Sequence, residues 1–152
     1  MTTTARPISI RPVSRADLLE IVKIERASFP QPWPYRAFET YLDEPAFLVA
    51  DSNGEIVGYI VADVTRQYGR PVGHVKDIAV RDEVRRSGIG AALLERAMNI
   101  LDSHGAGAVM LEVRPSNEAA RRLYHSYGFE RDHRVDGYYD DEDAIVLVRR
   151  LG

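Results

Sequence analysis

The chain has 152 residues, a formal net charge of −3 and 45% hydrophobic residues, which suits a single domain over residues 1–152 with a sizeable core. No apolar run approaches the roughly 20 residues of a membrane span, and the acidic balance argues against broad binding of nucleic acids. The absence of cysteine excludes disulfides and a thiolate nucleophile, and no pair among the 4 histidines has zinc spacing, so we expect a cytoplasmic protein without a metal.

Periodicity and turn residues predict the elements of the first half of the chain. Ser14 is a candidate N-cap with Asp17 in the first turn, and apolar residues recur after it at helical spacing until Pro30. Asn53 and Gly54 predict a hairpin turn between two apolar strands. The expected elements are a strand over residues 8–11, a helix from Ser14 to Pro30, a helix over 35–42, and strands over 47–50 and 56–65.

Strands and helices alternate in the second half. A β-branched strand over 75–80 leads into a turn rich in arginine and glycine, which opens an amphipathic helix that ends near Ser103. The order β-α-α-β-β-β-α-β-α-β-β predicts an α/β domain of α+β flavour, with helices on the faces of a mixed sheet. The remaining expected elements are a strand over 109–113, a helix from Asn117 to Gly128, and strands over 130–136 and 144–151.

The turn before the third helix has the composition of an anion site. Gly88 and Gly90 let the main chain approach a ligand with no Cβ in the way. The N–H groups of the first helical turn point at such a ligand, and the helix dipole favours negative charge there. Arg85 and Arg86 add positive charge. The turn therefore predicts a site for a phosphorylated cofactor, although a solvated turn that carries arginines would have the same composition.

Several motifs, in order along the chain, resemble those of the GNAT acetyltransferases. They are Ile78 to Val80, Arg85 to Gly90, Leu111 to Asn117, Leu123 with Tyr124, and Gly128 with Phe129. More narrowly, they are similar to the motifs of RimI and of the archaeal and eukaryotic Ard-type N-terminal protein acetyltransferases. The resemblance covers residues 8–151 and implies the GNAT fold: about seven mostly antiparallel strands with one splayed pair, flanked by about four helices.

The resemblance implies acetyl-coenzyme A as the acetyl donor. Its pyrophosphate would bind the amides of residues 86–91, with Arg122 or an arginine of the turn at the ribose phosphate. The pantetheine arm would pair with residues 78–80 as a pseudo-strand, and Asn117 would bond it from the far side. The residues expected to bind the cofactor are Ile78, Ala79, Val80, Arg85, Arg86, Ser87, Gly88, Ile89, Gly90, Ala91 and Asn117.

Direct acetyl transfer to an amine needs a proton acceptor and a proton donor for the leaving thiolate. Glu112 is the first candidate base because a buried carboxylate without a role or a partner is costly in an apolar strand, although a pairing with Arg114 or a lysine would also explain it. His74 is the second candidate, since imidazole exchanges protons near neutral pH; its alternative is a strand-end histidine with an ordinary partner. Tyr124 shares a helix face with Asn117 and would donate to the thiolate, or pack in the core. The resemblance to RimI-type and Ard-type enzymes implies the catalytic roles.

Four aromatic residues are expected to contact a peptide substrate. Tyr138 and Tyr139, in a hairpin that resembles the substrate side of the N-terminal acetyltransferases, would clamp its first residues. Phe29 and Trp33, with Pro32, would form the opposite wall. The alternative for the two tyrosines and for Trp33 is packing in the core. The acidic run over 140–143 is either a solvated hairpin tip or an attractor for a cationic amine.

The leading hypothesis is direct transfer of an acetyl group from acetyl-coenzyme A to the α-amine of a protein N-terminus, with a ribosomal protein as a candidate substrate. Three alternatives stay open. The acceptor is a lysine or a small-molecule amine, the chain binds acetyl-coenzyme A without catalysis, or it is a subunit that needs a partner. We expect a monomer or a weak homodimer.

Overall fold

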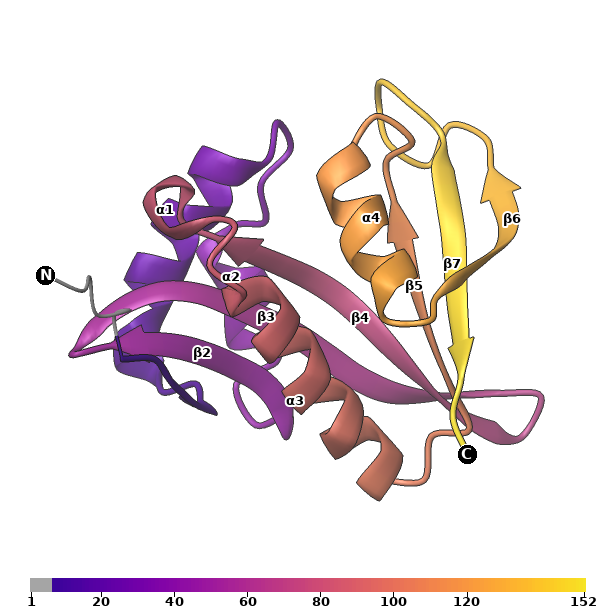
Figure 1. Ribbon diagram of the computed structural model, residues 1–152, viewed down its shortest axis with the longest axis horizontal. Coiled ribbons are helices and arrows are strands. Elements are labelled where there is room, and N and C mark those ends of the chain that lie inside the picture. Colours follow the sequence, from indigo (N-terminus) through magenta and orange to yellow (C-terminus); the bar gives the residue numbers. More distant parts are fainter. Residues whose placement is uncertain (1–6) are drawn as a thin grey trace, which may run out of the picture. The chain divides into compact units, whose positions relative to one another are not determined.

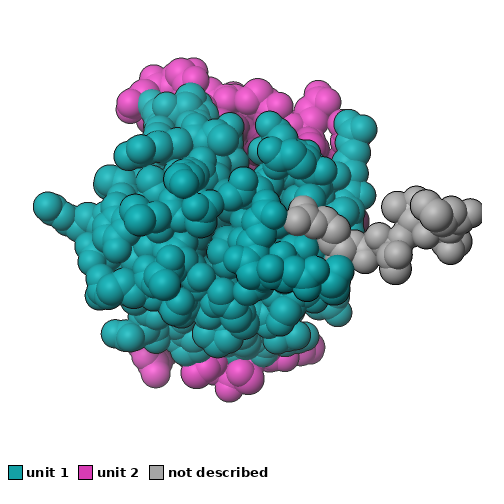
Figure 2. Space-filling model, turned by 90° about the vertical axis from the view of Figure 1, so that its left-hand side faces the viewer, with its two compact units in different colours: residues 1–62, 77–100 teal, residues 63–76, 101–152 magenta. Residues whose placement is uncertain are grey.

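The computed structural model describes residues 7–152, and Figure 1 shows its helices and strands. The chain divides into two compact units, drawn in different colours in Figure 2. Unit 1 takes in the chain up to Ala62 together with Asp77–Ile100, and unit 2 comprises Asp63–Lys76 and Leu101–Gly152. The single domain expected over residues 1–152 stays a prediction, and its first six positions lie outside the described residues.

The elements follow the predicted order. Within residues 7–152, seven strands form one mixed sheet in the order β1-β2-β3-β4-β5-β7-β6, in which β4 and β5 are parallel. The elements are β1 (Ser9–Pro12), α1 (Leu18–Ser28), α2 (Tyr35–Glu39), β2 (Ala46–Ser52), β3 (Glu55–Gln67), β4 (Arg70–Val80), α3 (Ile89–Ser103), β5 (Ala108–Val113), α4 (Glu118–Ser126), β6 (Glu130–Val135) and β7 (Ala144–Arg150), with 3-10 turns at Arg15–Asp17 and Asp82–Val84. The predicted fold class, α/β of α+β flavour, is confirmed.

The hairpin between β3 and β4 is longer than predicted. β3 continues to Gln67, and β4 begins at Arg70 rather than at Val75. Tyr68 and Gly69 between them have φ angles of 52° and 78°. Two successive positive φ angles are typical of the type I′ turn, whose twist matches that of the antiparallel strands it joins.

Gly73 explains why the sequence pattern hid the first half of β4. Glycine and Pro71 both disfavour strands, so the stretch looks like a loop. In the structure, a Cβ at Gly73 would lie 2.9 Å from Leu101 Cδ1 and 3.1 Å from Val109 Cγ2. Because a side chain would collide with the helix residue and the neighbouring strand, glycine is what lets this strand pack closely.

The core of unit 1 lies between the helices α1 and α2 and one face of β2 and β3. Alternation along β3 sends Tyr59 and Val61 into this core, whereas a Cβ at Gly58 would lie 3.3 Å from Leu93 Cδ1 of α3. α1 and α2 therefore cover one face of these strands and α3 covers the other (Figure 1). The buried core residues are Leu18, Ile21, Val22, Ile24, Phe38, Phe47, Val49, Ile56, Tyr59, Val61 and Ala79.

Unit 2 pairs β5 antiparallel with β7, and β7 antiparallel with β6. The first part of β4 pairs in parallel with β5, Gly73–Val75 against Val109–Leu111. The splayed pair expected beyond this ladder stays a prediction. Asn117 is the N-cap of α4, as predicted, since its Oδ1 accepts the Ala120 N–H at 3.2 Å.

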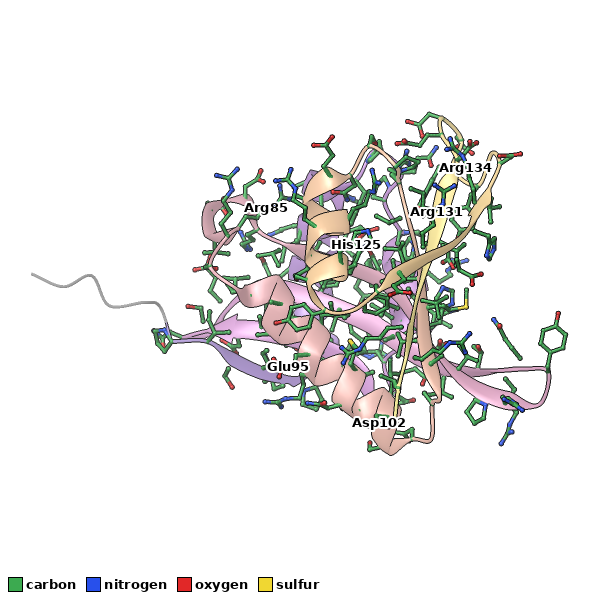
Figure 3. The ribbon with its side chains drawn as sticks, turned by 45° about the vertical axis from the view of Figure 1, so that its right-hand side comes forward. Arg85, Glu95, Asp102, His125, Arg131 and Arg134 are labelled. Carbon is green, nitrogen blue, oxygen red and sulfur yellow. The ribbon has the colours of Figure 1, made fainter. Side chains whose placement is uncertain are left out.

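β6 is an edge strand of the sheet and pairs only with β7 in the strand order. Every residue of β6 is exposed except the half-buried Val135. Figure 3 labels two of its charged residues, Arg131 and Arg134. Most residues of β6 are polar on both faces of the strand. Its alternation of apolar and polar residues is therefore much weaker than the apolar run of β7.

Two further observations apply to the part of the chain from residue 7 onward. None of its helices is long and apolar enough to cross a bilayer. It also holds no group of three or more histidine, aspartate and glutamate side chains close enough to share one metal ion.

Candidate active site

The two candidate bases form one hydrogen-bonded pair in unit 2. Nε2 of His74 lies 2.7 Å from Oε1 and 3.0 Å from Oε2 of Glu112. The parallel ladder explains the contact, because it sets His74 opposite Met110 and alternation brings Glu112 to the same face. The two side chains are 17% and 13% exposed, so the pair is partly buried and still reached by solvent. A carboxylate can only accept, and therefore we assign the Nε2 proton to His74 as donor.

Tyr138 adds a second donor to Glu112. Its hydroxyl donates to Glu112 Oε1 at 3.3 Å, and the side chain is 51% exposed. Burial, followed by the negative charge of Glu112, raises the pKa of Tyr138, so the phenol keeps its proton at neutral pH. The structure thus brings a residue expected at the substrate together with both candidate bases.

Arg114, the alternative partner considered for Glu112, contacts the acidic run over residues 140–143 and Tyr139. Its Nη1 lies 2.5 Å from Asp141 Oδ1 and 3.3 Å from Glu142 Oε1. Its Cζ also lies 4.2 Å from the centre of the Tyr139 ring. Burial, with smaller contributions from Tyr138 and Glu112, raises the pKa of Tyr139 to about 12. Arg114 therefore holds the tyrosine-containing loop, while His74 and Tyr138 contact Glu112.

Donors of the protein engage most of the acidic run over residues 140–143. Glu142 accepts from Ser116 Oγ at 2.6 Å, and Asp143 accepts the Gly137 N–H at 2.8 Å. These hydrogen bonds lower the pKa of both carboxyl groups. The run is a hydrogen-bonded turn, which supports the first of its two interpretations over attraction of a cationic amine.

Tyr124 lies in the core of unit 2. It is 5% exposed, and its ring packs edge-to-face on Phe129 with the ring centres 5.8 Å apart. Core packing thus accounts for the ring, while the hydroxyl as a proton donor stays a prediction. Asn117 uses Oδ1 for the helix cap, which leaves the two N–H groups of its amide available as donors.

The turn before α3, in unit 1, has the main-chain geometry of an anion site. Arg86 and Gly88 have φ angles of 68° and 85°. The N–H of Ala92 bonds to the Gly88 carbonyl at 3.0 Å, so the N–H groups that precede it have no acceptor within the helix. A Cβ added at Gly88 would meet nothing within 4 Å. The turn therefore presents unsatisfied amides to open space and fits a diphosphate group.

The arginines expected at the phosphates differ in what holds them. Arg85 forms an ion pair with Asp82 and donates to the Val80 carbonyl at 3.1 Å, so its guanidinium is tied to its own segment. Arg86 is exposed on the turn. Arg122, in unit 2, lies 3.5 Å from Glu118 on an exposed helix face. Of the two turn arginines, Arg86 is the better placed to meet an anion.

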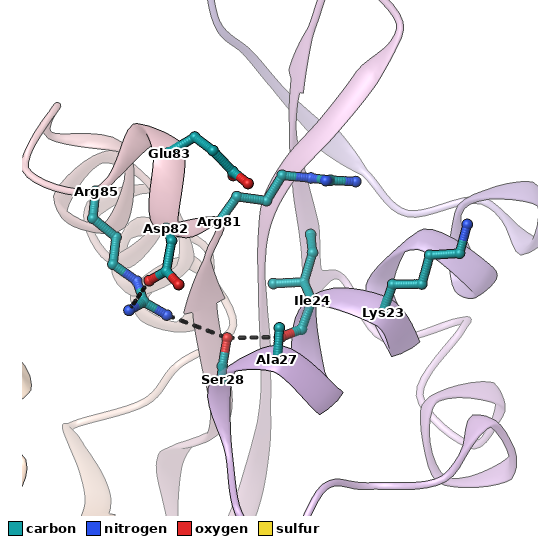
Figure 4. A pocket seen from close by; sticks show the side chains of 8 residues that line it. All are labelled: Lys23, Ile24, Ala27, Ser28, Arg81, Asp82, Glu83 and Arg85. Carbon is teal, nitrogen blue, oxygen red and sulfur yellow. Dashed lines mark hydrogen bonds and ion pairs between the residues drawn. The ribbon is translucent and has the colours of Figure 1, made fainter.

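A small cavity of about 100 Å³ lies beside the segment that leads to this turn (Figure 4). Arg85 donates to Ser28 Oγ at 3.4 Å across it, and Ser28 Oγ donates to the Ile24 carbonyl at 2.7 Å. Asp82 and Glu83 also line it, while neither glycine of the turn does. Because none of residues 86–91 lines it, this cavity is not the expected anion site.

The residues expected on the α1–α2 loop pack against the core of unit 1. Phe29 and Trp33 are both half-buried there. The Trp33 ring centre lies 5.2 Å from that of Phe38 and 5.7 Å from that of Tyr41, with which it is stacked. Trp33 therefore packs against the core of unit 1, and its contact with a substrate stays a prediction.

Sequence reasoning missed a buried carboxylate cluster in unit 1. Glu25 of α1 is 1% exposed, and its Oε1 accepts the Tyr59 hydroxyl at 2.5 Å. The same hydroxyl lies 3.5 Å from Asp77 Oδ2. Burial, together with the hydrogen bond and charge of Glu25, raises the pKa of Asp77 well above its ordinary value.

A signal for this cluster was present in the sequence. Glu25 falls at i+7 from Leu18, on the same helical stripe as Ile21 and Val22. A charged residue that interrupts an apolar stripe must be buried with partners or turned out to solvent. Its partners, Tyr59 and Asp77, lie on β3 and β4, and the sequence of α1 does not predict which residues of these strands it contacts.

The family of the chain follows from comparison with known proteins. The model of the acetyltransferase (GNAT) family matches residues 18–129, and the chain belongs to this family. An N-alpha-acetyltransferase of Sulfurisphaera tokodaii is 38% identical over 154 residues, covering 93% of this chain and 92% of that protein. The N-alpha-acetyltransferase RimI of Mycobacterium tuberculosis is 36% identical, covering 100% of this chain and 98% of that protein.

Solved structures agree with the family. The crystal structure of Ard1 from Thermoplasma volcanium superposes with a TM-score of 0.88 at 28% identity, covering 95% of this chain and 98% of that one. A chain in the crystal structure of the NatC complex bound to Gag peptide and CoA gives 0.88 at 25% identity, covering 95% and 99%. The expected GNAT fold is confirmed.

Proposed function

We propose that this protein is an acetyl-coenzyme A-dependent N-α-acetyltransferase that transfers an acetyl group directly to the α-amine of a protein N-terminus. The observation that carries the proposal is the hydrogen-bonded set of His74, Glu112 and Tyr138 on a GNAT fold. Relatives named N-alpha-acetyltransferase match over 93% and 100% of this chain, which favours an α-amine over other acceptors.

The chain's own residues fit acetyl-coenzyme A. The amides of residues 86–91 and the exposed Arg86 suit its diphosphate and ribose phosphate, and the edge of β4 at Ile78–Val80 suits its amide-containing arm. Asn117 has N–H groups to donate to the same arm. A similar chain, in the NatC complex, was solved with CoA. When bound, the cofactor supplies an acetyl group activated as a thioester.

His74 and Glu112 are proposed to act together as the general base. An α-ammonium group has a pKa of about 7.7–8.0, so a fraction of the acceptor must lose a proton before it attacks. The Nε2–H of His74 donates a hydrogen bond to Glu112, so Nδ1 of the imidazole keeps a lone pair that can accept a proton. The Glu112 carboxylate then stabilises the protonated imidazole.

The remaining steps need no covalent enzyme intermediate, in keeping with a chain that has no cysteine. The amine nitrogen forms a bond to the acetyl carbon as the carbon–sulfur bond breaks. The proton of the amine passes to the His74–Glu112 pair, and the hydroxyl of Tyr124 holds a proton for the leaving sulfur. Tyr138, Tyr139, Phe29 and Trp33 are proposed to contact the first residues of the acceptor peptide.

The test is a panel of peptides that differ in their first two residues, offered with acetyl-coenzyme A beside free lysine, polyamines and aminoglycosides. We expect acetylation at peptide α-amines. Acetylation of the small amines alone would overturn the proposal, and coenzyme binding without any transfer would identify a binding module. A protein that gains turnover only when a cell extract is added would be a subunit with an obligatory partner.

The variant Gly90→Glu tests the cofactor assignment independently, because its carboxylate would occupy the diphosphate site. We expect calorimetry to show at least tenfold weaker acetyl-coenzyme A binding, equivalent to about 1.4 kcal/mol. Unchanged binding would show that the cofactor does not bind at the turn before α3. The cytoplasmic location, the ribosomal-protein substrate and the monomeric or weakly dimeric state remain part of the proposal.

A further inference from the structure

The loop between α1 and α2 has few ways to be held in place. Pro30, Pro32 and Pro34 supply no N–H groups, so a loop that has no helix or strand of its own also lacks half of the usual donors. The N–H of Phe29 bonds to the Glu25 carbonyl at 3.0 Å, and the N–H of Trp33 bonds to Glu25 Oε2 at 2.8 Å. One residue of α1 thus holds both ends of the loop.

The carboxylate of Glu25 is held in an unusual way for a buried charge. The Tyr59 hydroxyl and the Trp33 N–H, both neutral, donate to it, and Asp77 is a further hydrogen-bonding neighbour. A buried carboxylate is costly without a cation, and an apolar residue of similar size would normally pack better in such a place. Asp77, whose pKa is raised well above its ordinary value by burial and by Glu25, lies beside the shared hydroxyl. Core packing alone therefore does not account for a glutamate at this position.

The side chain of Trp33 adds the second attachment of the loop. Its ring stacks on Tyr41 and tilts against Phe38, while its own N–H is bound by Glu25. The backbone and the ring of one residue are therefore fixed by different partners. Loss of the hydrogen bond would leave the ring packed but release the backbone of the loop at Trp33.

We propose that Glu25 is a positioning residue for acceptor binding, which fixes the 29–34 loop through the Trp33 N–H so that this loop is preformed for the peptide. The inference rests on the proposed function, in which Phe29 and Trp33 contact the substrate. A preformed loop does not have to be ordered by each incoming peptide, so the contact acts on affinity for the acceptor and not on the chemical step.

Steady-state kinetics test the inference. Glu25→Ala should raise the KM for peptide about tenfold, the effect of losing roughly 1.4 kcal/mol, with kcat and the KM for acetyl-coenzyme A within about twofold of wild type. Glu25→Gln keeps an acceptor for the Trp33 N–H and should restore most of the affinity. Arg26→Ala, on the exposed face of the same turn, is the matched control and should change nothing.

Trp33 is the only tryptophan of the chain, which provides a readout that does not need catalysis. Glu25→Ala should shift its fluorescence emission to longer wavelength and increase its quenching by acrylamide, and Glu25→Gln should do so less. If Glu25→Ala fails to fold, Glu25→Gln alone tests the inference. It should then show a small shift of the fluorescence emission and a small rise in the KM for peptide.

The outcomes separate the two proposals. If wild-type protein acetylates no peptide while the fluorescence of the Glu25 variants shifts, the proposed function fails and the anchoring of the loop stands. If the folded variants keep both the wild-type fluorescence and the wild-type peptide KM, the role of Glu25 is overturned. A fall in kcat at unchanged KM would likewise overturn it, since the residue would then act on the chemistry.

Discussion

Units 1 and 2 each place a carboxylate against a tyrosine hydroxyl, Glu25 with Tyr59 in one and Glu112 with Tyr138 in the other. The first pair is closed off, with Glu25 1% and Tyr59 0% exposed, whereas Tyr138 is 51% exposed and Glu112 also meets an imidazole. The Glu25 carboxylate is therefore out of reach of solvent, whereas solvent reaches both Glu112 and Tyr138. Access to solvent, rather than the identity of the groups, therefore separates a structural carboxylate from a candidate base.

The comparison is tested most strongly by the same substitution in both units. Glu112→Gln should lower kcat at neutral pH by about 10²–10³-fold, the range over which a general base contributes, and leave acetyl-coenzyme A affinity unchanged. Glu25→Gln should leave kcat within about twofold. Steady-state rates at saturating cofactor measure both, and equal losses of kcat would abolish the distinction between the clusters.

The pairing of His74 with Glu112 predicts strong non-additivity. His74→Ala should cost about 10²-fold in kcat, and the double variant with Glu112→Gln should be no slower than the more impaired single variant. Rates of the four proteins, measured on one peptide, complete the cycle. Losses that multiply would mean that the two residues act in separate steps.

The closed cluster predicts a pH-dependent gain in stability. The raised pKa of Asp77 means that the folded state keeps a proton which the unfolded state has lost, so Asp77 makes the free energy of unfolding fall as pH rises above its ordinary value near 3.9. Asp77→Asn removes the ionisable group and therefore this fall in the free energy of unfolding. Its Tm should exceed that of wild type by about 2–4 °C at neutral pH, as a gain of 1 kcal/mol gives in a domain of this size, and match it below about pH 4. Calorimetric scans from pH 3 to 8 measure this, and a gain independent of pH would contradict a shared proton.

The smallest effect is expected for the exposed hydroxyl. Tyr138→Phe removes one donor to Glu112 at 3.3 Å and should lower kcat/KM by about two- to fivefold, with Tm unchanged within 1 °C. Tyr59→Phe, the matched change in the closed cluster, should instead lower Tm and leave kcat nearly unaltered. Reversal of the two effects would show that exposure does not separate the clusters.

Local pattern predicted the order of all the elements and the family of the chain, because periodicity, caps and turn residues are properties of neighbouring residues. Asn117 was recognised as the start of α4 for this reason, and its cap is confirmed. The extended β3–β4 hairpin was missed because Gly73 has a packing role that its propensity contradicts.

The contacts of the site were not predictable in the same way. His74 and Glu112 were separate candidates in the sequence, since the parallel register that joins their strands depends on how two distant segments align. Glu25 drew no attention because a glutamate in a helix is usually exposed. Only the strands beneath α1 reveal that its carboxylate is buried.

The exposed, charged strand β6 at the edge of the sheet has a consequence for the behaviour of the protein in the cell. An open strand edge recruits strands from other molecules, and charged side chains discourage this association. Glu130, Arg131, Asp132 and Arg134 place charges of both signs along β6. The charges on β6 therefore protect the open edge of the sheet against aggregation. Replacing Arg131 and His133 by valine should make concentrated solutions precipitate while the fold persists.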